Sequence, residues 1–246
     1  MPAKWIDIGV NASTMEGYLT QPEGEGSHPA VVVIQEIWGV NSHIQSVVDR
    51  LPSLGYVGLA PAMFHREGPM TTGLHEEMDT AIARMRNSTD ADILADVNAA
   101  MAYLKAQSFV VGDKIGIVGF CMGGRVAWLA AATNTHYKAT VPYYGGSIMV
   151  TRGAGVQTPL ELADNINCPM LFHFGEIDAN PSQDDMAKLD AELTRLGKPH
   201  QFFSYPEADH GFADHTGARY NREGAEIAWP RTLQFFAAHL KGAPVV

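Results

Sequence analysis

A cysteine, an aspartate and a histidine follow one another along this chain in an order that suits nucleophilic catalysis. Cys121 lies in the segment Gly119-Phe120-Cys121-Met122-Gly123, Asp178 follows Gly175-Glu176-Ile177, and His210 precedes Gly211. A thiol needs less activation than a hydroxyl because its pKa is already close to neutrality. A histidine can accept and return its proton, and an aspartate can hold the imidazole in one tautomer. The three residue types therefore predict acyl transfer through a covalent intermediate.

The residues around Cys121 predict the sharp turn that a nucleophile needs. Residues 115–119 alternate β-branched residues with glycine, as a buried strand does, and residues 125–132 favour a helix. A tight strand–turn–helix connection exposes its central side chain above the sheet edge, and it requires small neighbours. The backbone N–H of Met122 would then stabilise an oxyanion at the start of the helix. A buried structural cysteine in a closely packed turn is the alternative interpretation.

Other residues could fill these roles, and each chosen residue has a structural alternative. Glu176 and Asp184 are rival acids. Asp178 could cap a turn, His210 could bond to backbone, and Glu36 could form an ion pair at a strand end. The remaining candidates are expected to be structural: His173 in the core or a pocket wall, His65 and His215 in exposed loops, and Cys168 buried and inert.

Strands alternate with helices along the chain. Short apolar or β-branched runs predict strands, here at 5–10, 15–20, 30–35, 56–60, 114–120, 139–144, 170–174 and 201–205. Capping residues and Gly or Pro stops predict helices, here at 41–54, 90–107, 125–132, 181–196 and 227–240. We expect a single α/β domain over residues 1–246, with a mostly parallel, twisted sheet covered by helices on both faces.

In such a sheet the carboxyl ends of the parallel strands meet at one edge, where ligands bind. Four expected strand ends carry a reactive residue, namely Glu36, Cys121, Asp178 and His210. The order nucleophile, acid, histidine along the chain is the order of the α/β-hydrolase fold. Residues 63–89 mix Gly, His, Met and charged residues with a weak helical pattern, and we expect them to lie above the sheet near the site.

Composition excludes several classes of function. The 246 residues are 46% hydrophobic and carry a formal net charge of −10, which disfavours nucleic acid and anionic membranes as partners. The two cysteines suggest neither a disulfide framework nor a zinc site. Neither a signal peptide, a membrane span, a P-loop nor a dinucleotide fingerprint is recognisable. We therefore expect a cytoplasmic protein with no cofactor and no metal, and a monomer is preferred.

Taken together, these segments resemble the dienelactone hydrolase family of the α/β-hydrolase superfamily, to which carboxymethylenebutenolidases belong. The resemblance extends from about residue 5 to about residue 240, and a Glu combined with a Cys elbow is specific to this family within the superfamily. The matching residues are Gln35-Glu36-Ile37-Trp38-Gly39-Val40-Asn41, Gly119-Phe120-Cys121-Met122-Gly123-Gly124, Gly175-Glu176-Ile177-Asp178, His210-Gly211-Phe212, Tyr220 and Ala228-Trp229.

The resemblance implies a role for each matching residue. Cys121 would be the nucleophile, His210 the base and Asp178 the acid that orients it. Glu36 would lie beside Cys121 and help to generate the thiolate when substrate binds. A carboxylate there disfavours the thiolate by repulsion, yet it can accept the thiol proton. The backbone N–H of Ile37 would be the second oxyanion donor beside Met122. Independently of the resemblance, plausible pocket walls are Trp38, Tyr143, Tyr144, Phe212 and residues 63–85.

One position departs from the family pattern. Members that bind a substrate carboxylate place an Arg four residues after the catalytic His, where this chain has Asp214. Arg84, Arg86 or Arg219 could compensate. We therefore expect a cofactor-free hydrolase of small-molecule esters or lactones. The alternatives are a non-catalytic binding relative, or another hydrolase, such as a thioesterase or a carbon–halogen hydrolase, on the same site.

Overall fold

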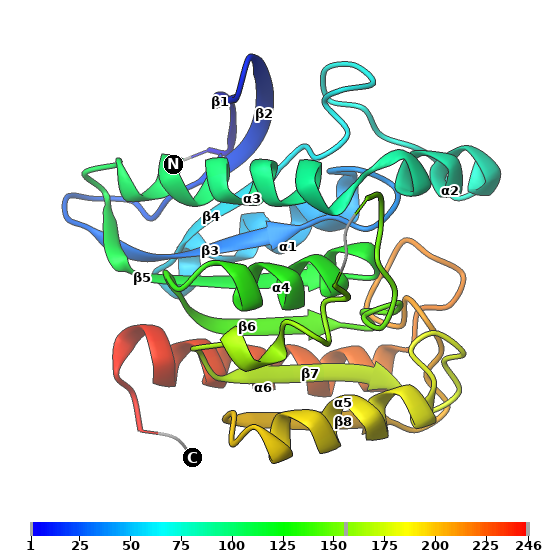
Figure 1. The fold of residues 1–246 in the computed structure, drawn as a ribbon. Helices are drawn as coiled ribbons and strands as arrows, with labels where there is room; N and C mark the ends of the chain where they lie inside the picture. The colour runs from blue at the N-terminus through cyan, green and yellow to red at the C-terminus, as the bar shows by residue number, and fades with distance from the viewer. Residues whose placement is uncertain (1, 155–156, 245–246) are drawn as a thin grey trace.

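The sheet that the sequence predicts is present in the computed structural model, which describes residues 2–154 and 157–244 (Figure 1). Its eight strands lie in the order β1-β2-β4-β3-β5-β6-β7-β8. Their bounds are β1 Lys4–Val10, β2 Ser13–Thr20, β3 His28–Ile34, β4 Val57–Pro61, β5 Val110–Phe120, β6 Tyr137–Tyr143, β7 Met170–Gly175 and β8 His200–Tyr205. The β1–β2 and β2–β4 pairs are antiparallel and the others are parallel. The central parallel strands are apolar on both faces because helices cover both faces.

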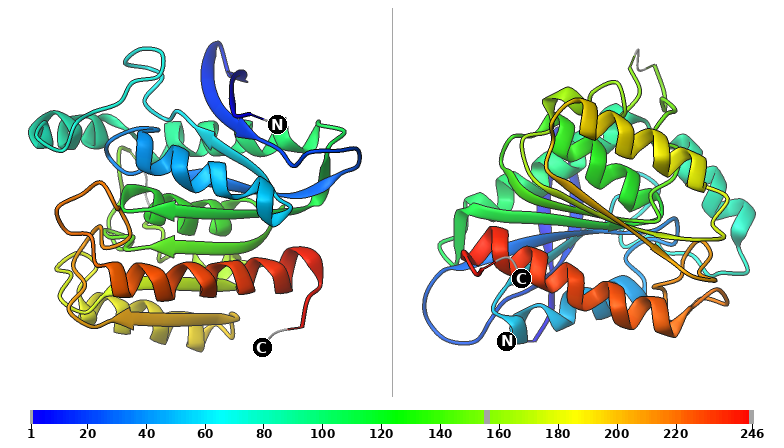
Figure 2. Two further views of the ribbon diagram at one scale, coloured as in Figure 1. Left: turned by 180° about the vertical axis from the view of Figure 1, so that it is seen from behind. Right: turned by 90° about the horizontal axis from the view of Figure 1, so that it is seen from below.

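Helices pack on the two faces of the sheet and form two separate layers of core (Figure 2). Helices α3, α4 and α5 lie on one face, and α1 and α6 lie on the other. The helix bounds are α1 Ser42–Arg50, α2 Met78–Asn87, α3 Asp90–Lys105, α4 Met122–Thr133, α5 Gln183–Arg195 and α6 Arg222–Lys241, with short 3-10 turns at Pro52–Leu54 and Ala163–Asn165. The predicted α/β fold is therefore confirmed, whereas the single-domain organisation stays a prediction.

Two expected helices differ from the structure at one end. The helix expected over 41–54 ends at Arg50, because Pro52 cannot donate a backbone hydrogen bond and begins a 3-10 turn instead. The last helix begins at Arg222 rather than at Ile227, because the Asn221 side chain caps it by accepting from the N–H of Gly224 at 2.9 Å. Across the described residues, the structure contains no helix with the length and hydropathy of a membrane span.

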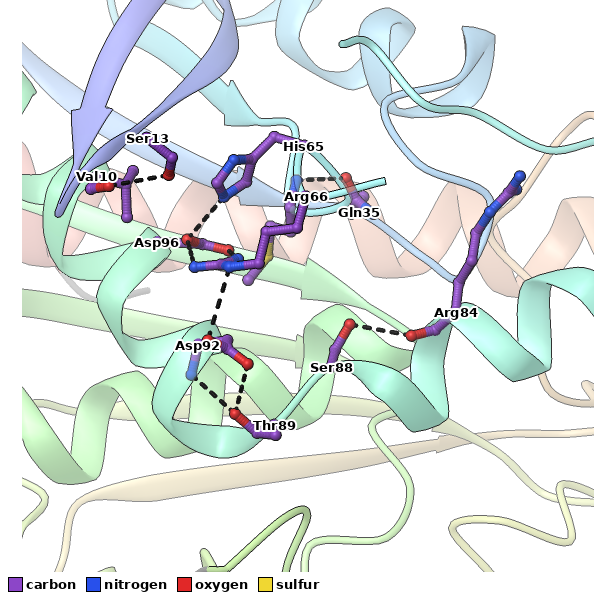
Figure 3. A network of polar contacts seen from close by, with 11 residues as sticks. Val10, Ser13, Gln35, His65, Arg66, Arg84, Ser88, Thr89, Asp92 and Asp96 are labelled. Atoms are coloured by element: carbon purple, nitrogen blue, oxygen red, sulfur yellow. Dashed lines mark hydrogen bonds and ion pairs between the residues drawn. The ribbon is translucent and has the colours of Figure 1, made fainter. Parts of the chain in front are cut away.

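The segment between β4 and α3 lies beyond the carboxyl ends of the parallel strands, as expected, and includes α2 (Figure 1). A network of polar contacts anchors it (Figure 3). Arg66 binds the Asp96 carboxylate of α3 with two hydrogen bonds of 2.7 and 2.8 Å, and His65 Nε2 lies 3.1 Å from the same group. Gln35, directly after β3, accepts from the backbone N–H of Met63 at 3.1 Å. The segment is therefore fixed to α3 and to the end of β3.

Candidate active site

Cys121 lies between β5 and α4 in a backbone conformation that non-glycine residues rarely adopt. Its φ is 54° and its ψ is −116°. A Cβ atom on Gly119 would lie 1.9 Å from the carbonyl oxygen of Gly123, and one on Gly123 would lie 2.4 Å from that of Ile34. Because no side chain fits at either position, the two glycines allow the chain to turn sharply at Cys121. The turn has the geometry that the sequence predicts.

His210 and Asp178 come from the loops that follow β8 and β7, and they form a hydrogen-bonded ion pair. His210 Nδ1 lies 3.0 Å from Asp178 Oδ2. The Asp178 carboxylate is buried, and its Oδ1 accepts a second hydrogen bond from the backbone N–H of Asn180 at 2.8 Å. The His210 side chain also makes a hydrogen bond with the Cys121 side chain. The structure thus brings together the three residues that the sequence singled out.

Cys121 and His210 shift each other's pKa in opposite directions. Burial by itself would raise the pKa of Cys121, but the charge of His210, its hydrogen bond and the backbone N–H of Met122 together lower that pKa. Burial by itself would lower the pKa of His210, but the Cys121 charge and the hydrogen bond with Asp178 raise it to about 11. Both shifts favour a thiolate next to an imidazolium.

Glu36 lies on the turn after β3 and is buried, with 2% of its surface exposed. Burial, followed by the charges of Cys121 and Asp214, raises the pKa of Glu36 well above its usual value. Its Oε2 atom and the hydroxyl of Tyr144 form no hydrogen bond of normal geometry with any described residue. The two groups are nevertheless close enough that the charge of Glu36 adds to burial in raising the pKa of Tyr144. The Glu36 carboxyl therefore holds its proton more strongly than an exposed glutamate does.

A cavity of about 610 Å³ opens onto these side chains. Glu36, Cys121 and His210 line it, together with Ile37, Trp38, Met122 and, from α2, Met78, Ile82 and Met85. Trp38 is therefore a wall residue, as expected, and the two residues expected to donate oxyanion hydrogen bonds border the same space. Apolar surface from the β4–α3 segment covers one side of this cavity.

Tyr144 and Phe212 do not border the cavity as the sequence predicted, and this is a correction. Both are fully buried, and their rings pack edge to face, with an interplanar angle of 70° and centroids 5.4 Å apart. Tyr144 also packs against the His210 ring at 5.3 Å. Gly211, with a φ of 82°, turns the chain inward so that Phe212 enters the core beneath His210. Tyr144 therefore supports the His210 ring, and Phe212 packs against Tyr144. Tyr143 is also a core residue, and its hydroxyl lies 2.7 Å from Thr232 Oγ1.

Arg152 is a cavity residue that the sequence analysis missed. It lies in the loop after β6, and its Nη1 atom is buried without a hydrogen-bond partner among the described residues. Burial, followed by the charge of Arg125, lowers the pKa of Arg152 to about 10. The Asp90 carboxylate accepts from the backbone N–H of Arg152 at 3.0 Å and is bound by the Arg125 guanidinium with two hydrogen bonds of 2.6 and 3.0 Å. No sequence pattern marks Arg152, because it lies well beyond the end of β6 at Tyr143, within residues 147–167, which were predicted only as a long loop.

The three arginines proposed to compensate for Asp214 have different positions. Arg84 donates to Glu67 at 2.9 Å and is occupied. Arg219 lines the cavity and lies 3.5 Å from Asp209. Arg86 is in the last turn of α2 and does not border the cavity. Asp214 itself does line the cavity, so the departure from the family pattern falls within the site.

The other histidines and the second cysteine are mostly placed as expected. His173 is fully buried between Tyr205 and Thr232, and burial lowers its pKa to about 3. Cys168 is buried, and burial raises its pKa to about 11. His215 is exposed. The expectation of an exposed His65 is wrong, because its contact with the Asp96 carboxylate holds it in the interior.

His43, Asp214 and His215 could hold a metal ion, since one ligand atom from each lies within 4.8 Å of the other two. His43 Nδ1 is 3.4 Å from His215 Nδ1 and 3.6 Å from Asp214 Oδ1. Burial, only partly offset by the charge of Asp214, lowers the pKa of His43 to about 4, so this imidazole is neutral near pH 7.

The chain is similar to several known proteins. The model of the dienelactone hydrolase family matches residues 15–240. A "Putative carboxymethylenebutenolidase" from Synechocystis is 37% identical over 227 residues, which is 92% of each chain. A "Probable 2-oxo-3-(5-oxofuran-2-ylidene)propanoate lactonase" from Bradyrhizobium is 31% identical over 98% of this chain and 96% of its own.

A solved structure is similar over nearly the same length. The "Putative Dienelactone Hydrolase" from Klebsiella pneumoniae superimposes with a TM-score of 0.86 at 31% identity, covering 96% of this chain and 98% of its own. The family model spans almost the whole chain, and the Synechocystis relative covers 92% of it. The chain therefore belongs to the dienelactone hydrolase family.

Proposed function

We propose that this protein hydrolyses carboxylic esters or lactones through a Cys121–His210–Asp178 triad and a thioacyl-enzyme intermediate, without a cofactor in the reaction. The observation that carries the proposal is the chain of contacts from Asp178 through His210 to Cys121, which lies at a glycine-flanked turn facing a cavity. Membership of a hydrolase family supports the same reaction class. No step of the proposed reaction uses a nucleotide.

The reaction proceeds in two acyl transfers. The Cys121 thiolate attacks the substrate carbonyl, a C–S bond forms, and the backbone N–H groups of Met122 and Ile37 stabilise the oxyanion. Collapse of this tetrahedral species breaks the C–O bond, and the leaving alkoxide takes a proton from His210. Neutral His210 then removes a proton from water, which attacks the thioester. The acid leaves, and Cys121 again becomes a thiolate beside a protonated His210.

Glu36 assists in forming the thiolate. Its raised pKa makes the ionised carboxyl a stronger base than an exposed glutamate, and therefore better matched to a thiol. Cys121 and Glu36 also repel each other when both are charged, so a proton on one of them favours charge on the other. A substrate that enters the cavity and changes this balance would couple activation of Cys121 to binding.

An anionic substrate fits the charges of the cavity. Arg152 offers a buried guanidinium N–H with no partner among the described residues, on the side of the cavity formed by the loop after β6. The Bradyrhizobium relative carries the name of a lactone with a propanoate group. We therefore favour lactones or esters with a carboxylate directed towards Arg152 and away from Asp214.

Intact-mass spectrometry after brief incubation with activated esters and an enol-lactone tests the proposal. Wild-type protein should gain the mass of the acyl group transiently, and Cys121→Ala should neither gain it nor turn over substrate. Cys168→Ala is the matched control, because Cys168 is buried with a raised pKa; it should behave as wild type. Turnover by Cys121→Ala at a rate near that of wild type would contradict the mechanism.

A further inference from the structure

We propose that His43, Asp214 and His215 form a tetrahedral binding site for a divalent zinc ion, separate from the Cys121 nucleophile. His43 lies near the start of α1, and the other two residues lie in the loop between β8 and α6. His43 and His215 are 172 residues apart in the chain, so the site has no ligand-spacing motif that could be recognised in the sequence. Asp214 also borders the catalytic cavity, but the proposal does not rest on the proposed hydrolase reaction, in which we assign zinc no step.

The distances between the ligand atoms match zinc. Zinc binds histidine nitrogen and carboxylate oxygen at about 2.0–2.2 Å, so the edges of its tetrahedron measure about 3.3–3.6 Å. The distance from His43 Nδ1 to His215 Nδ1 is 3.4 Å, and that from His43 Nδ1 to Asp214 Oδ1 is 3.6 Å. Both are long for a hydrogen bond but correct for two ligands on one ion.

His43 Nδ1 and His215 Nδ1 make only a long contact with each other, at 3.4 Å. One hydrogen between the two nitrogens would make an N–H···N hydrogen bond, but 3.4 Å is long for such a bond. A cation bound to both Nδ1 atoms would satisfy both lone pairs.

Neighbouring groups hold the carboxylate in place, as the outer contacts of metal ligands usually do. Asp214 Oδ1 accepts hydrogen bonds from the backbone N–H and the hydroxyl of Thr216, at 2.8 and 2.7 Å. His75 Nε2 lies 3.3 Å from Oδ2 and 3.2 Å from the Thr216 hydroxyl. The ring of His75 in turn packs on Trp38 with centroids 4.7 Å apart. The carboxylate is therefore preorganised before an ion arrives.

An ion can reach the site from outside the catalytic cavity. His43 and His215 line a second cavity of about 600 Å³, between α1 and α6. Its charged residues are Asp49, Glu226 and Arg50, and the Arg50 guanidinium stacks on the Trp229 ring at 4.6 Å. An ion held here would tie α1 to the loop that also carries His210. The expected consequence is a more stable protein with a fixed β8–α6 loop.

Zinc chloride titrated into chelator-treated full-length protein, followed by isothermal calorimetry, tests the site. Cys121 could bind zinc itself, so Cys121→Ser is measured beside the wild type. We expect one zinc ion per chain in both, and affinity reduced by at least about tenfold in His215→Asn. Because His215 is exposed, this variant should fold normally. His200→Asn is the matched control, since His200 also contacts an aspartate, at 3.1 Å from Asp190, and it should bind as wild type.

Substitution with Co²⁺ provides a second readout, because a tetrahedral ion gives intense visible absorption and an octahedral one does not. The intense spectrum should appear with the wild type and with Cys121→Ser, and it should be lost in His215→Asn. Zinc binding that disappears in Cys121→Ser would place the ion at the thiolate and overturn the proposal. Equal affinity in His215→Asn, or no binding by the wild type, would overturn it as well.

Discussion

Each of two histidine–aspartate pairs has one member in the loop between β8 and α6, and the two imidazoles are in opposite protonation states. His210 contacts Asp178 at 3.0 Å, and the Cys121 charge helps to raise the pKa of His210 to about 11. His43 lies 3.6 Å from Asp214, and burial lowers the pKa of His43 to about 4. The first imidazole is cationic and the second is neutral at pH 7. Burial lowers the pKa of both imidazoles. At His210 the Cys121 charge and the hydrogen bond with Asp178 outweigh burial, whereas at His43 the Asp214 charge does not, and the charges of His215, Arg50 and His75 lower the pKa further.

The difference separates two kinds of chemistry. A protonated histidine beside a thiolate can donate to a leaving group and then act as a base. A neutral histidine with a free nitrogen offers a lone pair, which suits a metal ion or a hydrogen bond. Glu36 is affected by both sides, because the charge of Asp214 raises its pKa and the charge of His210 lowers it.

Removing the charge of Asp178 should produce the largest effect. In Asp178→Asn the imidazole loses the anion that fixes its tautomer and stabilises its charge, so kcat/KM should fall by about 10⁴-fold. Steady-state hydrolysis of an activated ester measures this. Asp184→Asn, a change in a rival acid on α5, is the control and should retain the wild-type rate. A similar loss in both variants would show that the acid has been misassigned.

Replacing Glu36 should produce the next largest effect, with opposite signs for activity and stability. Glu36→Gln removes the group that takes the Cys121 thiol proton and then holds it beside the thiolate, so kcat/KM should fall by about 10–100-fold. The folded protein keeps a Glu36 proton that the unfolded chain releases above its ordinary pKa of 4.5. Stability from this group is therefore complete below that pKa and declines as the pH rises towards the raised folded pKa.

Glu36→Gln has no such decline, so its melting temperature at pH 7 should exceed that of the wild type. Differential scanning calorimetry at pH 4 and pH 7 measures the difference between the two proteins. A variant that is less stable than the wild type at pH 7 would argue against a buried, protonated Glu36.

Replacing Arg152 should have the smallest effect and should depend on the substrate. A hydrogen bond to a charged group contributes about 1.5–3 kcal/mol, so Arg152→Met should lower kcat/KM for carboxylate-bearing esters by at least about tenfold. A neutral ester of the same leaving group is the control, and its kcat/KM should change by less than about twofold. Equal losses for both esters would show that Arg152 does not select the anion.

Much of the fold, and the positions of the proposed triad residues at strand ends, could be predicted from sequence because both depend on local patterns. Glycines 119 and 123 mark the turn, and apolar runs ending at Glu36, Cys121 and Asp178 mark the strand ends. The burial of Phe212 could not be predicted, since it depends on the direction in which Gly211 turns the chain. The contact between His43 and His215 was also not predicted, because the two residues are 172 positions apart and no sequence motif links them.

Burial and charge at single side chains were equally beyond the sequence. His65 is buried because Asp96, on another element, accepts its hydrogen bond and pairs with Arg66. Arg152 is a candidate for binding a substrate carboxylate because its buried Nη1 atom has no hydrogen-bond partner among the described residues, and the sequence does not show this burial. In each case a tertiary contact determines the electrostatic environment of the side chain, and the amino-acid composition does not indicate that contact.

The pH dependence of alkylation by iodoacetamide tests the central claim, the thiolate–imidazolium pair, most directly. Peptide mass spectrometry follows Cys121 and Cys168 in one sample, and the pKa of Cys168 is raised to about 11 by burial. The account predicts that Cys121 reacts with an apparent pKa below its ordinary value of 9.0, and that Cys168 remains unmodified near neutrality. Alkylation of Cys121 that rises only around the ordinary thiol pKa, and is unchanged in Asp178→Asn, would contradict the account.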